Sequence, residues 1–151
     1  MNLEDIENLA NQLLSEHKLT DKGWKFKWDN AKRRFGNCSH RRKQITLSRH
    51  LTPLRELSAI RNTILHEIAH ALVGPRNGHN KVWKAKALEI GCTGDRCSTD
   101  VSISPQYKGT CPNCKREIHR HRRKNISCGK CDRNFNPLFV FVWEKINKNP
   151  L

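Results

Sequence analysis

His66-Glu67-Ile68-Ala69-His70 is an HExxH motif. Residues four positions apart lie one above the other on an α-helix, so both imidazoles can reach one zinc ion. Glu67 can then reach a water bound to the same ion and act as the general base. Apolar residues recur every three or four positions around the motif, at Leu57, Ile60, Ile64, Ile68 and Leu72. This spacing predicts a long, mostly buried helix.

The ends of this helix are marked by residues with strong positional preferences. Thr52 can act as the N-cap and Pro53 suits the first helical position, so the helix is predicted to begin there. Gly74-Pro75 predicts its end, because glycine permits a left-handed cap and proline cannot continue a helix. A second helix is expected over Asn80 to Ile90, after a glycine-containing turn.

Catalytic zinc commonly binds three protein side chains and a water, so the motif needs a third ligand. His79 lies nine residues after His70, and Gly78 gives the backbone room to turn it back toward the motif. Glu89 lies nineteen residues after His70, a spacing found in zincins that take a glutamate from a second helix. We favour His79 because a neutral imidazole is a strong zinc ligand, whereas Glu89 can equally be a solvated helix residue.

Two CxxC knuckles, Cys111 with Cys114 and Cys128 with Cys131, are separated by thirteen residues. This spacing is slightly shorter than the usual range of about fifteen to twenty residues but still fits a zinc ribbon, in which four thiolates close a tetrahedral site and leave no position for a substrate. We therefore expect a structural zinc that supplies folding energy to a segment too short for its own core. Two disulfides are the alternative; we disfavour them because no secretory signal precedes the chain and cytosolic thiols stay reduced.

Three further cysteines lie outside the knuckles: Cys38, Cys92 and Cys97. The odd total of seven fits free thiols better than a full disulfide framework. The spacing of Cys92 and Cys97 would also allow a loop clip or an extra metal ligand. We expect burial as small apolar side chains instead.

The chain carries a formal net charge of +15, from 29 Lys and Arg against 14 Asp and Glu. Such an excess suggests a polyanionic partner, which we expect to be DNA, with an affinity that falls steeply with salt. The candidate phosphate contacts are Arg41, Arg42 and Lys43 in one basic segment and Arg116, Arg120, Arg122, Arg123 and Lys124 in another. The alternative is a solvated basic face without a nucleic-acid role.

Trp24, Phe26 and Trp28 alternate with lysines in the first basic segment. This alternation is typical of a half-buried strand, and the alternative is a surface on which bases stack. No apolar run is long enough to cross a membrane, so no membrane partner is expected.

These patterns predict an α+β protein with two domains. The first, residues 1–102, would hold a helix over Asn2 to Leu19, a short antiparallel sheet and the two later helices. The expected strands are Trp24 to Trp28, a segment around Phe35, and Gln44 to Ser48. The second domain, residues 103–151, would be a β-rich ribbon closed by a strand over Phe139 to Trp143. The stretch from Ser102 to Pro105 marks the boundary.

The sequence resembles the SprT-like family of zinc metalloproteases over most of its length. The matching motifs are His66-Glu67-x-x-His70-Ala71, Gly78-His79 with Trp83, Trp24-x-Phe26, Gly36 and Ile45-Thr46-Leu47-Ser48. The family usually has a glycine where this chain has Asn80, which affects the loop and leaves the histidine in place. The resemblance implies a zincin-like domain in which His66, His70 and His79 bind zinc and Glu67 is the base.

The resulting hypothesis is a zinc-dependent endoprotease that acts on DNA-associated proteins, as in the repair of DNA-protein crosslinks; this substrate comes from the resemblance alone. Its cofactors would be two zinc ions, one catalytic and one structural. We expect single-stranded or junction-containing DNA as partner, a monomeric chain, and a cytoplasmic or nucleoid-associated location. The alternatives are a non-enzymatic, zinc-stabilised regulator that binds nucleic acid, a zinc hydrolase of another substrate, and a protease that ignores DNA.

Overall fold

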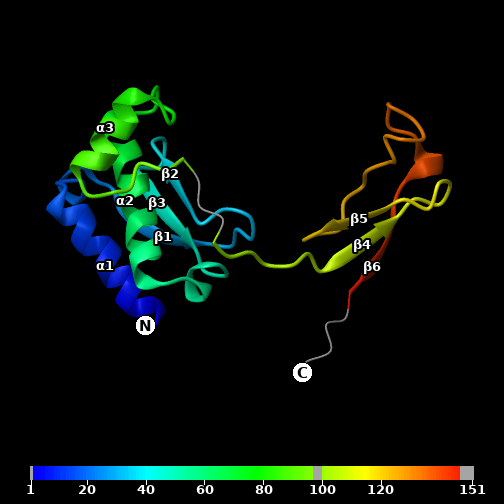
Figure 1. Ribbon diagram of the computed structural model, residues 1–151, viewed down its shortest axis with the longest axis horizontal. Helices are drawn as coiled ribbons and strands as arrows, with labels where there is room; N and C mark the ends of the chain where they lie inside the picture. Colours follow the sequence, from blue (N-terminus) through cyan, green and yellow to red (C-terminus); the bar gives the residue numbers. More distant parts are fainter. Residues whose placement is uncertain (1, 97–99, 147–151) are drawn as a thin grey trace. The chain divides into compact units, whose positions relative to one another are not determined.

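The computed structural model describes residues 2–96 and 100–146, which fall into two compact units within Met1–Ile103 and Ser104–Leu151 (Figure 1). The first unit contains α1 (Leu3–Glu16), β1 (Lys25–Asp29), β2 (Gly36–Ser39), β3 (Gln44–Ser48), α2 (Leu57–Val73) and α3 (Lys81–Glu89). The second contains β4 (Tyr107–Thr110), β5 (Glu117–Arg120) and β6 (Val142–Lys145). The described chain is therefore α+β, as the sequence predicts, and none of its helices is long and apolar enough to cross a membrane.

The core of the first unit lies between its helices and one face of its sheet (Figure 1). The apolar stripe of α1 is buried, and Asn2 and Asp5 form a capping box at the start of that helix. The central element is α2, which contacts α1, α3, β2 and β3. Its residues Ile64, Ile68 and Ala69 are completely buried, so the rotation of α2 about its axis is fixed by packing.

The alternating strand around Trp24 is confirmed, and the alternative of a base-stacking surface is wrong for two of its three aromatic residues. Trp24 and Phe26 are buried in the core, and Trp28 is partly buried against it. Lys25 and Lys27 are exposed. Side chains on a strand alternate between faces, so the aromatic residues face the helices.

The first sheet is mixed, so the prediction of an antiparallel sheet is wrong. Its strand order is β1-β3-β2, with Phe26 of β1 paired in parallel to Ile45 of β3 and Cys38 of β2 paired antiparallel to the same residue. The chain passes from β1 to the far edge of the sheet, and the β2–β3 hairpin then places β3 in the middle. As a result β3 runs in the direction of β1, and β2 is an edge strand.

The helix that carries the motif begins at Leu57, four residues later than predicted. Thr52 lies in the short 3-10 helix η2 (Thr52–Leu54), and the next residue, Arg55, is extended with φ −114° and ψ 153°. The guanidinium of Arg55 donates a 2.7 Å hydrogen bond to Thr63 Oγ1 and lies 3.8 Å from the ring centre of Phe35. These buried contacts hold the chain in a turn where the Thr-Pro pair alone predicts a helix start.

Two other boundaries also differ from the prediction. The first helix ends at Glu16 instead of Leu19, because Lys18 takes a left-handed φ of 60° and turns Leu19 into the core. The closing strand β6 begins at Val142 instead of Phe139. Pro137 starts the 3-10 helix η3 (Pro137–Phe139), since it cannot donate a ladder hydrogen bond.

The second unit is a three-stranded antiparallel sheet, in the order β5-β4-β6, with a very small core. That core consists of Cys111, Ile118, Cys128 and Phe141, with a few partly buried apolar side chains against it. Trp143 covers Gly109, where a Cβ atom would lie 3.0 Å from the indole. A core this small needs an additional crosslink or metal for stability.

Candidate metal centre

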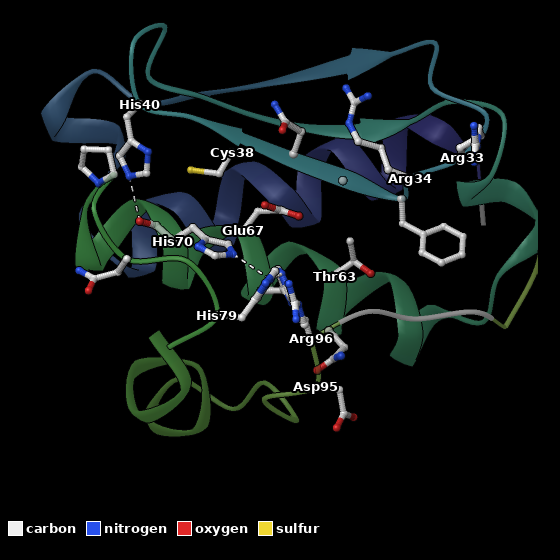
Figure 2. A pocket seen from close by; sticks show the side chains of 17 residues that line it. Arg33, Arg34, Cys38, His40, Thr63, Glu67, His70, His79, Asp95 and Arg96 are labelled. Carbon is white, nitrogen blue, oxygen red and sulfur yellow. Dashed lines mark hydrogen bonds between the residues drawn. The ribbon is translucent and has the colours of Figure 1, made fainter. Parts of the chain in front are cut away.

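Three histidine side chains converge in the first unit, two from α2 and one from the turn before α3. The Nε2 atom of His79 lies 2.9 Å from that of His66 and 3.2 Å from that of His70, and His70 and His79 point toward one another in Figure 2. Zinc bound to histidine at about 2.0–2.1 Å in a tetrahedron separates neighbouring nitrogens by roughly 3.3 Å. Both distances are close to this value, and the ligand atoms of all three histidines lie within 4.8 Å of one another, so the cluster fits a three-histidine zinc site.

The protonation of these histidines also suits a metal. Burial, followed by the neighbouring His70 and His79, lowers the pKa of His66 to about 4. Burial is also the main cause that lowers the pKa values of His70 and His79. All three rings are thus neutral at pH 7, which is the form of imidazole that binds zinc.

Loop backbone groups approach the two helical histidines. Burial lowers the pKa of both rings, and the backbone of Asp95 opposes this shift at His66 as the backbone of Asn77 does at His70. A backbone group that raises the pKa of an imidazole is a carbonyl acceptor. A carbonyl near one ring nitrogen of a histidine leaves the other nitrogen available for a metal.

Asparagine side chains hold these two loops in place. Asn62, one turn before His66 on α2, accepts a 2.9 Å hydrogen bond from the backbone N–H of Thr93 and donates one of 3.3 Å to its hydroxyl. That contact positions the segment that contains Asp95. On the other side, Asn77 donates to the carbonyl of Val73 at 2.8 Å and accepts from Asn80, also at 2.8 Å.

The indole of one tryptophan packs against all three rings of the histidine cluster. Trp83 of α3 is buried, and its ring centre lies 4.6 Å from that of His66, 5.2 Å from that of His70 and 4.7 Å from that of His79. Its Nε1–H donates a 3.3 Å hydrogen bond to the carbonyl oxygen of His66. The side chain therefore restricts the rotation of all three imidazoles at once.

Glu67 lies on the same helix and is only 8 % exposed, beside the cleft that the histidines line. Burial raises the pKa of Glu67 to about 7, and the opposing charge of Arg34 limits this rise. The backbone of β2 approaches the carboxylate closely at Gly36, where a Cβ atom would lie 3.1 Å from Glu67 Oε1 and 3.0 Å from Thr63 Cγ2. A carboxylate held in this way can accept a proton near neutral pH.

The cleft has a volume of about 510 Å³ and contains residues that the sequence did not connect with the motif. His40 donates a 2.9 Å hydrogen bond to the carbonyl oxygen of His70. Burial, and then the charge of Glu67, raises the pKa of the Cys38 thiol to about 12, which keeps it protonated and a poor metal ligand. Arg34 and Arg96 also line the cleft. Only the tertiary fold brings these four residues to the histidines, so spacing along the chain gave no signal for them.

The alternative third ligand, Glu89, is not part of the histidine cluster. Its side chain is exposed on α3 and forms a 2.8 Å ion pair with Lys86. Cys92 is buried in the core of the first unit, where it behaves as a small apolar side chain. Cys97 lies outside the described residues.

The four knuckle cysteines form a second candidate metal site, in the second unit. Cys111 Sγ lies 3.8 Å from Cys131 Sγ, and Cys114 Sγ lies 3.7 Å from Cys128 Sγ. Disulfide sulfurs would be about 2.05 Å apart, whereas zinc with Zn–S bonds of about 2.3 Å in a tetrahedron separates them by roughly 3.8 Å. The cluster therefore fits zinc and excludes disulfides among these cysteines.

The candidate DNA-binding residues lie in both units. Arg41, Arg42 and Lys43 are exposed in the turn between β2 and β3. In the second set, Arg116 directly precedes β5, Arg120 is its last residue, and the other three follow it. Arg116, Arg122, Arg123 and Lys124 are exposed and Arg120 is partly buried. Their positions leave most of these cationic groups accessible to a ligand.

The sequence model of the SprT-like family matches residues 3–103, which is more than half of the chain and includes all three histidines. A search of curated proteins found no match.

If both clusters bind zinc, the purified protein carries two zinc ions per chain. His66→Ala should remove one of them and Cys128→Ser the other, because each change deletes one ligand of one site. His50→Ala, which changes an exposed histidine outside the cluster, should leave both. Metal analysis after dialysis against a weak chelator measures these contents. A single zinc in the wild-type protein, or two in His66→Ala, would contradict the assignment of the histidine cluster.

Asn62→Ala should lower the zinc affinity of the histidine cluster by about 10- to 100-fold, because the segment next to His66 that contains Asp95 loses its hydrogen bonds to α2. Asn11→Ala, an exposed asparagine of α1, is the matched control and should have no effect. Competition with a fluorescent chelator gives both affinities. Equal affinities in the two variants would show that the loop needs no such anchor.

Proposed function

Because the chain belongs to the SprT-like family, we propose that it is a zinc-dependent endoprotease of the zincin type. The zinc ligands are His66, His70 and His79, and the general base is Glu67. The observation that carries this proposal is the convergence of three Nε2 atoms beside a buried carboxylate of the same helix. A four-cysteine site has no open position for a substrate, so the ribbon zinc is structural in this proposal.

The positions of these groups support a role in peptide hydrolysis. When bound, zinc supplies a water of lowered pKa and polarises the carbonyl of the scissile bond. Glu67 accepts the proton of the attacking water and then gives it to the leaving amine. Burial raises the pKa of Glu67 toward the operating pH, where a general base works best, and the charge of a bound zinc ion would lower it again.

We propose further that the substrates are proteins attached to DNA, as in the repair of DNA-protein crosslinks. The net charge of +15 supports this proposal, since cationic groups gain affinity from a phosphate backbone by releasing counterions. The exposed basic residues of the β2–β3 turn and of the ribbon would provide these contacts. We propose that the DNA partner is single-stranded or contains a junction, and that the enzyme is a monomer.

The direct test compares wild-type protein with Glu67→Gln on a basic protein substrate, with and without single-stranded DNA. We expect DNA to accelerate cleavage, and Glu67→Gln to lower the rate by about 10²- to 10⁴-fold because the base is lost. Glu89→Gln is the matched control and should cleave normally. Electrophoresis of the products measures each rate.

Each rival function gives a different outcome in this experiment. Cleavage unchanged in Glu67→Gln would remove the mechanism, and loss of activity in Glu89→Gln would favour Glu89 as the third ligand. Absence of any cleavage would favour a zinc-stabilised nucleic-acid-binding regulator. Cleavage of the DNA itself would indicate a zinc hydrolase of another substrate. Cleavage of the protein at a rate that DNA does not change would indicate a protease that acts independently of DNA.

Gly36→Ala should lower kcat by about 10- to 100-fold at unchanged zinc content, because the added Cβ displaces the Glu67 carboxylate. Gly129→Ala, in the second unit, is the control, since its Cβ would meet no atom within 4 Å. Steady-state kinetics and metal analysis on both variants measure the effect. Equal kcat in Gly36→Ala and wild type would show that β2 does not position the base.

A further inference from the structure

Three arginines line the cleft that contains the histidines and Glu67. Arg33 and Arg34 belong to the connection between β1 and β2, and Arg96 belongs to the segment after α3. In Figure 2, Arg33 and Arg34 lie at the end of the cleft opposite His40. Arg96 lies near His79, whose pKa is lowered first by burial and then by the charge of this arginine. Positive charge is therefore present both near the histidines and at one end of the cleft.

Two of these arginines have their charge available for a ligand. Arg34 forms a 3.0 Å ion pair with Asp29. Arg33 and Arg96 are exposed, and neither makes an ion pair or a side-chain hydrogen bond within residues 2–96 and 100–146. Within the described residues, their guanidinium groups are therefore available to bind an anionic ligand at the cleft.

The walls of the cleft supply little negative charge to neutralise these groups. Two carboxylates line it in the described part of the chain, Glu67 and Asp95. Glu67 is almost fully buried, and the side chain of Asp95 points away from the histidines in Figure 2. A ligand in this cleft therefore faces an excess of cationic hydrogen-bond donors.

We propose that this cleft selects acidic polypeptide segments, with Arg33 and Arg96 binding carboxylate side chains that flank the bond to be cut. The inference rests on the proposed protease function and adds the class of substrate sequence. A guanidinium presents a planar fork of N–H donors that matches a carboxylate. A volume of about 510 Å³ suits a short stretch of extended polypeptide.

This preference is compatible with substrates attached to DNA. Basic segments of a DNA-bound protein contact phosphates and are covered by them, whereas acidic segments are repelled by the DNA and stay accessible. Selection of acidic segments would therefore direct cleavage to the accessible part of such a substrate. The DNA contacts of the enzyme are proposed to lie elsewhere, on residues that do not line this cleft.

The test uses three peptides that are identical except for Glu, Gln or Lys at the positions on each side of one scissile bond. With the full-length zinc protein and no DNA, kcat/KM should decrease in the order Glu, Gln, Lys. Exposed ion pairs predict a factor of up to about fivefold for each arginine, and the factor should shrink at high salt. Anisotropy titrations with the Glu67→Gln protein should give the same order of affinities without turnover.

Charge-reversed variants show which residues are responsible for the preference for the acidic peptide. Arg33→Glu and Arg96→Glu should each reduce or reverse the ratio between the Glu and Lys peptides, at unchanged zinc content. Arg61→Glu introduces the same charge on an exposed part of α2 outside the cleft and should leave the ratio as in wild type. Because the ratio compares two peptides on one protein, a general loss of activity does not imitate the effect.

Equal binding of the three peptides, or equal shifts in Arg33→Glu and Arg61→Glu, would overturn the inference. A third result would also overturn it: the three peptides bind equally, and a short oligonucleotide displaces them only when Arg33 is present. The cleft would then bind a phosphate backbone. If the wild-type protein cleaves no peptide, the proposed protease function fails. The anisotropy order still supports or overturns the acidic preference in that case.

Discussion

The structure of the candidate site depends on the burial of one face of α2. Ile64, Ile68 and Ala69 are completely buried against the other helices and the sheet, and this packing leaves the helix a single rotation about its axis. Side chains four residues apart share a face, so this rotation carries His66 and His70 into the cleft together. Glu67, the next residue, then meets the backbone of the edge strand β2 at Gly36.

Packing of the helix alone does not complete the site. His79 lies in a turn, and the backbone groups that approach His66 and His70 belong to the loops around Asp95 and Asn77. The indole of Trp83 contacts all three imidazoles. The histidines are thus held by elements that are far apart in the sequence. Of the arginines that line the cleft, Arg96 comes from the loop that contains Asp95, whereas Arg33 and Arg34 come from the connection between β1 and β2.

The sequence predicts the parts of this arrangement that depend on local spacing. The HExxH pair, the two cysteine knuckles and the apolar stripe of α2 each follow from a period or a motif, and the structure brings His79 to the first two histidines. The mixed sheet was missed, because strand direction depends on how the β1–β2 connection crosses the sheet. The start of α2 was placed at Pro53 for a similar reason, since the contacts of Arg55 with Thr63 and Phe35 are tertiary.

Anomalous diffraction at the zinc edge, from crystals of the purified protein, would locate the metal itself. We expect a peak about 2.0–2.1 Å from the Nε2 atoms of His66, His70 and His79. We also expect the Glu67 carboxylate to face the open side of that metal. A zinc ion bound through Glu89 or Cys38, or a Glu67 carboxylate turned away from the metal, would show that the zinc site or the general base is assigned wrongly.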